Sequence, residues 1–169
     1  MMNSNMRLAT EYDLHTINNI YNHYVANSTC TYQMEAERME DRVKWFAAHG
    51  EKHPVTVVEV EGKVVGWGSL SPFHRRAAYQ NSVENSIYIH HEHRRKGLGA
   101  AILADQIRRA REIGHRTILA LIDSDQAGSV GLHLKFGFAK VAHLKQVGFK
   151  FNRWLDTALM QCLLRERPR

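Results

Sequence analysis

The chain has 169 residues, of which 44% are hydrophobic and 24% are charged, close to the average for a globular protein. No apolar run approaches the ~18 residues of a membrane span, and the first residues lack the apolar core of a signal peptide, so we expect neither membrane insertion nor export. A formal net charge of +6 leaves nucleic acid, a membrane surface and a small polyanion open as partners.

The length indicates one domain, which we expect to span residues 1–169, because no repeat and no Pro-rich or Gly/Ser-rich linker divides the chain. The two cysteines, Cys30 and Cys162, lie far apart and do not form a disulfide framework. We therefore expect a cytoplasmic protein.

Hydrophobic periodicity gives the predicted elements in chain order. A short strand at 7–9 is followed by a helix that Asp13 can cap and whose apolar positions run from Leu14 to Tyr24. The later elements are a helix over 35–49, a hairpin of strands 55–60 and 64–70, a strand over 82–89, a helix over 98–113, a strand over 118–122, a helix over 129–136, and strands over 138–145 and 156–164. This order predicts an α/β (α+β) fold, a mixed sheet with helices on both faces.

The strongest local signal is the turn between the strand at 82–89 and the helix at 98–113. It holds three consecutive cations, Arg94 to Lys96, and two glycines, Gly97 and Gly99. Amide N–H groups at a helix start are unsatisfied, the helix dipole adds about half a positive charge there, and glycine lets a phosphate approach the main chain. The turn therefore predicts a pyrophosphate cradle, with a solvated basic turn as the alternative.

Arg94-x-x-Gly97-x-Gly99-Ala100 after Ile87-Tyr88-Ile89 resembles motif A of the GNAT acyl-CoA N-acetyltransferases. From about residue 7 to residue 162 the chain resembles, more specifically, the phosphinothricin and methionine sulfone/sulfoximine acetyltransferases of that superfamily. The further matching runs are Ile20-Tyr21-Asn22-His23-Tyr24-Val25, Arg76-x-Ala78-Tyr79, Ser82-Val83-Glu84-x-Ser86-Ile87-Tyr88-Ile89, Leu132-His133-x-x-x-Gly137-Phe138 and Gly148-x-Lys150-x-x-x-Trp154-x-Asp156.

The resemblance implies a mostly antiparallel central sheet that splays between its strands 4 and 5, acetyl-CoA as co-substrate, and a homodimer. Main-chain groups of Ile87, Tyr88 and Ile89 would pair with the pantetheine arm and the thioester. The amides of Arg95, Lys96, Gly97, Leu98, Gly99 and Ala100 would hold the pyrophosphate, and Gln126 and Ser129 would contact the co-substrate beyond strand 5. Gln126 stands where this family often has Asn.

Glu84 is the candidate base. Strand alternation places it on the face opposite Val83 and Asn85, in a sheet that should be largely buried. A buried carboxylate is costly without a partner or a task. An ion pair with one of the arginines is the alternative, and the resemblance favours Glu84 as the base, acting directly or through water.

His133 stands where many GNAT enzymes carry a tyrosine that is the proposed acid for the departing thiolate. A histidine with a pKa near neutrality can donate that proton or help to shape the pocket. A histidine that only fills a helix face is the alternative.

Arg76 and Tyr79 lie just before the Glu84 strand, on a loop that should reach the same cleft. A guanidinium forks onto a carboxylate or phosphinate, and a phenol adds one directed hydrogen bond, so we expect them to bind an anionic amino acid. Tyr32 falls where the family has an aromatic pocket wall, and core packing is an equal interpretation.

His90, His91 and His93 are also spaced as possible metal ligands. Adjacent residues of a strand point to opposite faces and no Cys or Asp completes a tetrahedral set, so we expect no metal.

Together the residues and the resemblance predict an acetyl-CoA-dependent N-acetyltransferase for the α-amine of phosphinothricin, methionine sulfoximine or methionine sulfone. Transfer would be direct in a ternary complex, because no nucleophile for an acyl-enzyme is evident. The alternatives are acetylation of a polyamine or a protein N-terminus, and a basic nucleic-acid-binding module. The arginines of the 98–113 helix remain unassigned.

Overall fold

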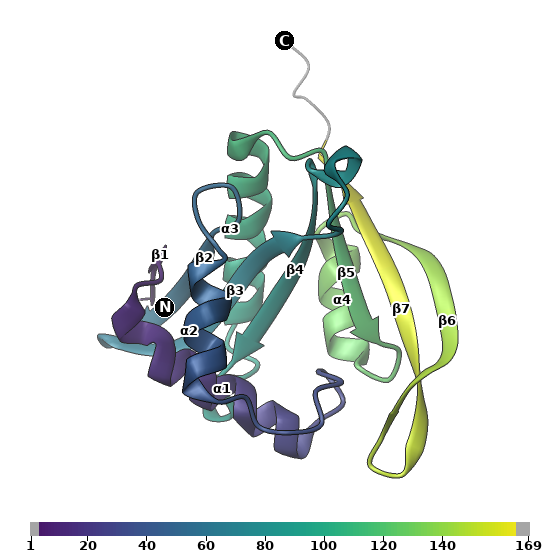
Figure 1. The fold of residues 1–169 in the computed structure, drawn as a ribbon, viewed down its shortest axis with the longest axis horizontal. Coiled ribbons are helices and arrows are strands. Elements are labelled where there is room, and N and C mark those ends of the chain that lie inside the picture. The colour runs from purple at the N-terminus through teal and green to yellow at the C-terminus, as the bar shows by residue number, and fades with distance from the viewer. Residues whose placement is uncertain (1–3, 165–169) are drawn as a thin grey trace.

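A single seven-stranded sheet forms the centre of the molecule, in the order β1-β2-β3-β4-β5-β7-β6 (Figure 1). The computed structural model describes residues 4–164. The strands are β1 (Ser4–Leu8), β2 (Val55–Val60), β3 (Lys63–Pro72), β4 (Ser82–Ile89), β5 (Thr117–Asp123), β6 (Ala139–Lys150) and β7 (Arg153–Leu163). All neighbours are antiparallel except β4 and β5, which confirms the predicted mixed sheet of an α/β (α+β) fold.

Helices cover both faces of this sheet. Within the described residues they are α1 (Leu14–Asn27), α2 (Met39–Ala47), α3 (Leu98–Ile113) and α4 (Ala127–Lys135), with 3-10 turns η1 (Glu11–Asp13), η2 (Ala77–Tyr79) and η3 (His91–His93). α1 and α2 lie on one face and α3 and α4 on the other (Figure 1). In the part of the chain that the structure describes, no helix is both long enough and apolar enough to cross a membrane.

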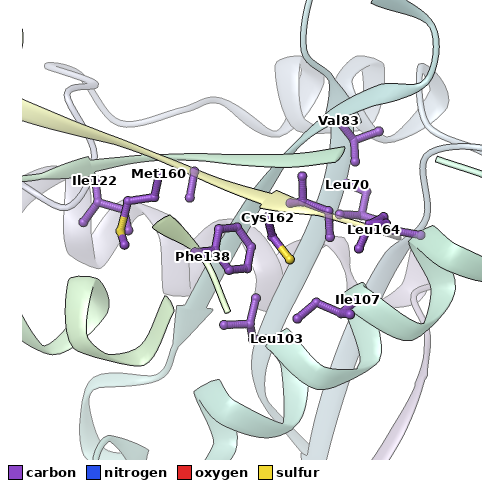
Figure 2. Close-up of a cluster of buried hydrophobic side chains, with 12 residues drawn as sticks. Leu70, Val83, Leu103, Ile107, Ile122, Phe138, Met160, Cys162 and Leu164 are labelled. Carbon is purple, nitrogen blue, oxygen red and sulfur yellow. The ribbon is translucent and has the colours of Figure 1, made fainter. Parts of the chain in front are cut away.

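Two apolar layers fix these helices. On one face Leu103 and Ile107 of α3 pack against buried side chains of four strands, including Leu70, Val83 and Met160 (Figure 2). On the other face Trp67 packs among the buried side chains of α1. Each fully buried aliphatic or aromatic side chain contributes about 1.5–3 kcal/mol, so the two layers hold the sheet from both sides.

The pairing of β4 with β5 is short. It joins Ser82 to Thr117, Val83 to Ile118 and Glu84 to Leu119, and beyond these pairs the strands diverge. This is the splay predicted between strands 4 and 5.

The helix expected over 35–49 begins only at Met39, because side chains of α1 hold the preceding residues in an extended segment. Asn18 and Asn22 donate to the main-chain oxygen of Glu37, and Asn22 accepts the Glu37 N–H. These bonds satisfy main-chain groups that a longer helix would have used.

Asp13 precedes α1 as predicted, but its carboxylate does not cap that helix. It accepts from the Thr10 N–H and from the guanidinium of Arg7, which holds the pKa of Asp13 below its ordinary value. Asp13 therefore closes the η1 turn and ties it to β1.

The last hairpin is longer than the sequence indicates. β6 runs to Lys150, and a two-residue turn at Phe151 and Asn152, both with φ near +55°, leads directly into β7. Positive φ at both turn positions matches the right-handed twist of the two strands, so the hairpin extends beyond the body of the sheet (Figure 1).

Close packing of α3 on β3 requires Gly68. A Cβ at this position would lie 2.5 Å from Ile102 Cγ2 and 2.6 Å from Gln106 Nε2. We expect Gly68→Ala to lower the free energy of unfolding by about 1–3 kcal/mol, the usual cost of overpacking, as measured by urea denaturation. Gly128→Ala is the control, because nothing lies within 4 Å of a Cβ there; equal losses in both variants would contradict the packing argument.

Candidate active site

A cavity of about 300 Å³ opens where β4 and β5 diverge. Seven of the predicted site residues line it: Tyr32, Glu84, Ile87, Tyr88, Gln126, Ser129 and His133. They come from the α1–α2 loop, β4 and α4, segments that are far apart in the sequence. The lining also includes Cys30, Thr31, Asn85, Asp123 and Thr157, which the sequence did not assign to a site.

Glu84 is the last residue of β4 that pairs with β5, and the cavity begins there. Burial raises the pKa of its carboxyl group. Among residues 4–164 no cation forms an ion pair with Glu84, so the alternative of a carboxylate paired with arginine is not what the structure shows. An unpaired, desolvated carboxylate is suited to accept a proton near neutral pH.

His133 is buried on α4, with 4% of its surface exposed, and both of its ring nitrogens are occupied. Nδ1 lies 2.8 Å from the Ser129 oxygen, and Nε2 lies 3.1 Å from Asn85 Nδ2. Burial lowers the pKa of His133. This geometry favours a histidine that shapes the pocket over one that donates a proton.

The turn before α3 presents main-chain amides without competition from side chains. Arg95 and Gly97 have φ of +61° and +81°, and no side chain caps the first turn of α3. A Cβ at Gly97 would meet nothing within 4 Å, so glycine is needed there for its backbone conformation and not for space. Among residues 4–164 no side chain caps these first amides of α3, and the binding of a pyrophosphate by Leu98, Gly99 and Ala100 stays a prediction.

One wall of the cavity is held by the β6–β7 hairpin. The ring of Tyr32 lies over Gly148, where a Cβ would approach it to 2.6 Å, and its hydroxyl donates to the Asp156 oxygen at 3.0 Å. Lys150 is 2% exposed and donates to the main-chain oxygens of Ser28 and Thr31 at 2.7 and 2.8 Å. The Gly148-x-Lys150 run thus fixes the α1–α2 loop in place.

Arg76 and Tyr79 are exposed and lie outside the cavity lining, at η2 between β3 and β4. Tyr79 packs edge-on against Phe73, with ring centroids 6.0 Å apart. The loop lies at the end of β4 that contains Glu84, and the substrate role of these two residues stays a prediction.

The three histidines before the cradle are arranged differently from what we expected. His90 and His91 stack at 4.4 Å because the chain leaves β4 and enters η3, so the argument that they point to opposite faces of a strand is wrong. Donor atoms of His90, His91 and Glu92 lie within 4.8 Å of one another, on a largely exposed surface.

A second cavity of about 440 Å³ lies between the end of α2, the start of β2 and the end of α3. Its walls include Leu8, Phe46, Pro54 and Ile113, and it contains none of the predicted site residues.

The chain is similar in sequence and in structure to known acetyltransferases. Residues 17–138 match the model of the acetyltransferase (GNAT) family. An L-amino acid N-acyltransferase (MnaT) of Escherichia coli (strain K12) is 36% identical over 163 residues, covering 96% of this chain and 95% of that protein. An L-methionine sulfoximine/L-methionine sulfone acetyltransferase of Salmonella typhimurium is 36% identical over 162 residues, covering 95% of each.

A solved structure shows the same similarity. A GNAT superfamily phosphinothricin acetyltransferase from Sinorhizobium meliloti, in complex with acetyl-CoA, superposes with a TM-score of 0.92 at 36% identity, covering 96% of this chain and 89% of that one.

Removal of the Lys150 amine tests the wall of the cavity. Lys150→Met leaves the Ser28 and Thr31 oxygens without their donor, so we expect a loss of about 1–3 kcal/mol in unfolding free energy and faster alkylation of Cys30 in the same loop. The measurements are urea denaturation and thiol labelling followed by mass spectrometry. Lys145→Met, which removes an exposed lysine of the same strand, is the control, and an identical labelling rate in the two variants would contradict the role of Lys150.

Proposed function

Because this chain belongs to the GNAT acetyltransferase family, we propose that it transfers an acetyl group from acetyl-CoA to the α-amine of a small amino acid. The acceptors we propose are methionine sulfoximine, methionine sulfone and phosphinothricin, on which its relatives are named as acting. The observation that carries this proposal is the Glu84 carboxylate at the start of the gap between β4 and β5, which has no ionic partner among residues 4–164.

The residues present fit acetyl-CoA. Beyond Glu84, β4 has no strand on its β5 side among the described residues, so the pantetheine arm would lie along Ile87, Tyr88 and Ile89. The main-chain groups of Tyr88 are turned toward β3 and the Ile89 oxygen accepts from the Tyr24 hydroxyl, so the main-chain groups of Ile87 and the Ile89 N–H are the ones available to the arm. The amides from Arg95 to Ala100 would hold the pyrophosphate, with Gln126 and Ser129 contacting the arm from α4. Bound acetyl-CoA supplies an activated thioester.

Glu84 removes the proton that an α-ammonium carries at neutral pH, directly or through water, because an amine must be uncharged to attack a carbonyl carbon. Main-chain N–H groups of β4 stabilise the oxyanion that forms. Cys30 lines the cavity, but burial raises the pKa of its thiol, which disfavours the thiolate that an acyl-enzyme would need. Direct transfer within a ternary complex follows.

The acceptor's carboxylate and its oxidised side-chain head carry negative charge or strong hydrogen-bond acceptors. Arg76 and Tyr79 supply a forked cation and a phenol at the Glu84 end of β4, and Tyr32 forms an aromatic wall. A polyamine is cationic and would be repelled by Arg75 and Arg76.

We propose further that residues 1–169 are one catalytic domain, that the protein is cytoplasmic and that it forms a homodimer. The dimer is supported by exposed apolar side chains on β6 and β7, including Val147, Phe149 and Trp154, which are 54%, 49% and 60% exposed. The rings of Phe149 and Trp154 pack against each other with centroids 5.1 Å apart, and exposed apolar patches mark interaction surfaces.

Glu84→Gln tests the base. We expect kcat/KM at neutral pH to fall by about 10²–10⁴-fold in a thiol-release assay, because the amide cannot accept the proton. In the unmodified enzyme kcat/KM should fall as pH drops through a value above the ordinary 4.5, because the base must be ionised and burial raises the pKa of Glu84. Glu61→Gln, in the β2–β3 turn, is the control; a Glu84→Gln enzyme at full rate would refute the mechanism.

Arg76→Glu tests the acceptor class. With a panel of amino acids and polyamines and acetyl-CoA, we expect this charge reversal to abolish turnover of methionine sulfone, because the forked cation is replaced by a repelling carboxylate. Lys63→Glu, which makes the same change of charge at the start of β3, should leave turnover intact. Polyamine acetylation that survives Arg76→Glu would identify a polyamine enzyme.

Light scattering tests the assembly. We expect a mass twice the 19.5 kDa of one chain and a shift to the single-chain mass on Trp154→Glu, which places a charge within the exposed apolar surface. Lys140→Glu, on the same hairpin, is the control for added negative charge. A single-chain mass for the unmodified protein would remove the dimer.

A further inference from the structure

Three buried side chains, two of which line the cavity, form a chain of hydrogen bonds whose direction is set at one end. Gln106 of α3 is 2% exposed, and its Nε2 lies 3.1 Å from the Ser69 oxygen and 2.9 Å from the Ser86 oxygen. Main-chain carbonyls only accept, so the group that faces them must be the NH₂ of the amide. The Gln106 Oε1 is therefore directed to the other side.

The next link is Asn85. Its Nδ2 lies 3.1 Å from Gln106 Oε1 and 3.1 Å from His133 Nε2. Because Oε1 only accepts, Asn85 must present its NH₂ group there, and the two hydrogens of that group serve both neighbours. The orientation leaves Asn85 Oδ1 buried without a partner among residues 4–164, so Gln106 imposes it against the preference of Asn85 itself.

The chain ends on the imidazole. Nε2 of His133 receives a hydrogen bond from Asn85 and must be the lone-pair nitrogen, so Nδ1 carries the proton and donates to the Ser129 oxygen at 2.8 Å. The Ser129 oxygen alone would also accept from an imidazolium. It is the NH₂ of Asn85 that excludes a second proton, because an N–H on Nε2 would point at another donor.

We propose that Gln106 and Asn85 are positioning residues that hold His133 as the neutral Nδ1–H tautomer in the wall of the acyl-transfer cavity. This inference rests on the proposed function for its catalytic meaning. His133 then has no free proton for the departing thiolate, and its ring packs edge-on against Phe138 with centroids 4.9 Å apart.

The charge of the His133 ring matters because ionisable groups line the same cavity. The charged groups there are the carboxylates of Glu84 on β4 and Asp123 on β5, and neither is hydrogen-bonded to His133. A positive charge close to a carboxylate lowers its pKa, so a neutral His133 in the same lining leaves the pKa of Glu84 to be set by burial.

The test is ¹⁵N NMR of the full-length protein with labelled histidine, His133 being assigned by its absence from a His133→Gln sample. From about pH 5 to 8 we expect a protonated Nδ1 and an unprotonated Nε2. In Gln106→Met the Asn85 amide is free to turn its oxygen to the ring, so the pKa of His133 should rise by about one unit or more. Gln161→Met, which removes a partly buried glutamine of β7, is the matched control and should leave His133 unchanged.

A wild-type His133 that carries its proton on Nε2, or that titrates identically in Gln106→Met, would overturn the inference. The wild-type spectrum decides the tautomer even if Gln106→Met fails to fold. In turnover, His133→Gln keeps an acceptor facing Asn85 and should lower kcat by about tenfold at most, whereas loss of a proton donor would cost about 10²–10⁴-fold. The NMR spectra do not require turnover, so they test the tautomer of His133 independently of the role of Glu84.

Discussion

The parallel pairing of β4 with β5 ends at Glu84 and Leu119, and the rest of the site depends on that limit. A strand that loses its neighbour on one side leaves main-chain groups to be satisfied by something else. Part of this demand is met within the protein, since the hydroxyl of Tyr24 donates to the main-chain oxygen of Ile89. The main-chain groups of β4 that remain unpaired face the cavity. The same gap therefore supplies both the space and the hydrogen-bonding groups for a ligand.

β4 keeps its position beside the gap because consecutive side chains anchor it to opposite layers. Ile87 packs toward α3, while Tyr88 stacks on Trp67 at 4.8 Å in the layer covered by α1 and α2. The same layer buries Arg42 under the rings of Tyr21 and Trp45, with Glu37 as its ionic partner. Because this buried cation contacts aromatic faces and one carboxylate, the layer contains directed polar contacts in addition to apolar packing.

The sequence predicted the elements of the sheet and a desolvated position for Glu84, because strand alternation leaves a visible pattern. It could not predict that Lys150 is buried, since a lysine in an exposed strand looks solvated until a loop more than a hundred residues away covers it. The sequence did not single out Asn85 and Gln106 for a related reason. Whether a side-chain amide donates or accepts a hydrogen bond depends on which atoms face it in the fold. The role of two arginines on α3 also became clear only in three dimensions, where Arg108 and Arg109 pair with Asp105 and Glu112.

The short β4–β5 junction also divides the sheet mechanically. On one side β1 to β4 form a continuous antiparallel unit, and on the other β5, β7 and β6 form a second one. Of the strand pairings among residues 4–164, widening the gap would break only the junction at Ser82, Val83 and Glu84, which is the shortest, while the pairings within each unit stay intact. The width of the cavity is therefore the most compliant dimension of the sheet, and a ligand that bridges the two units would act as a brace across it.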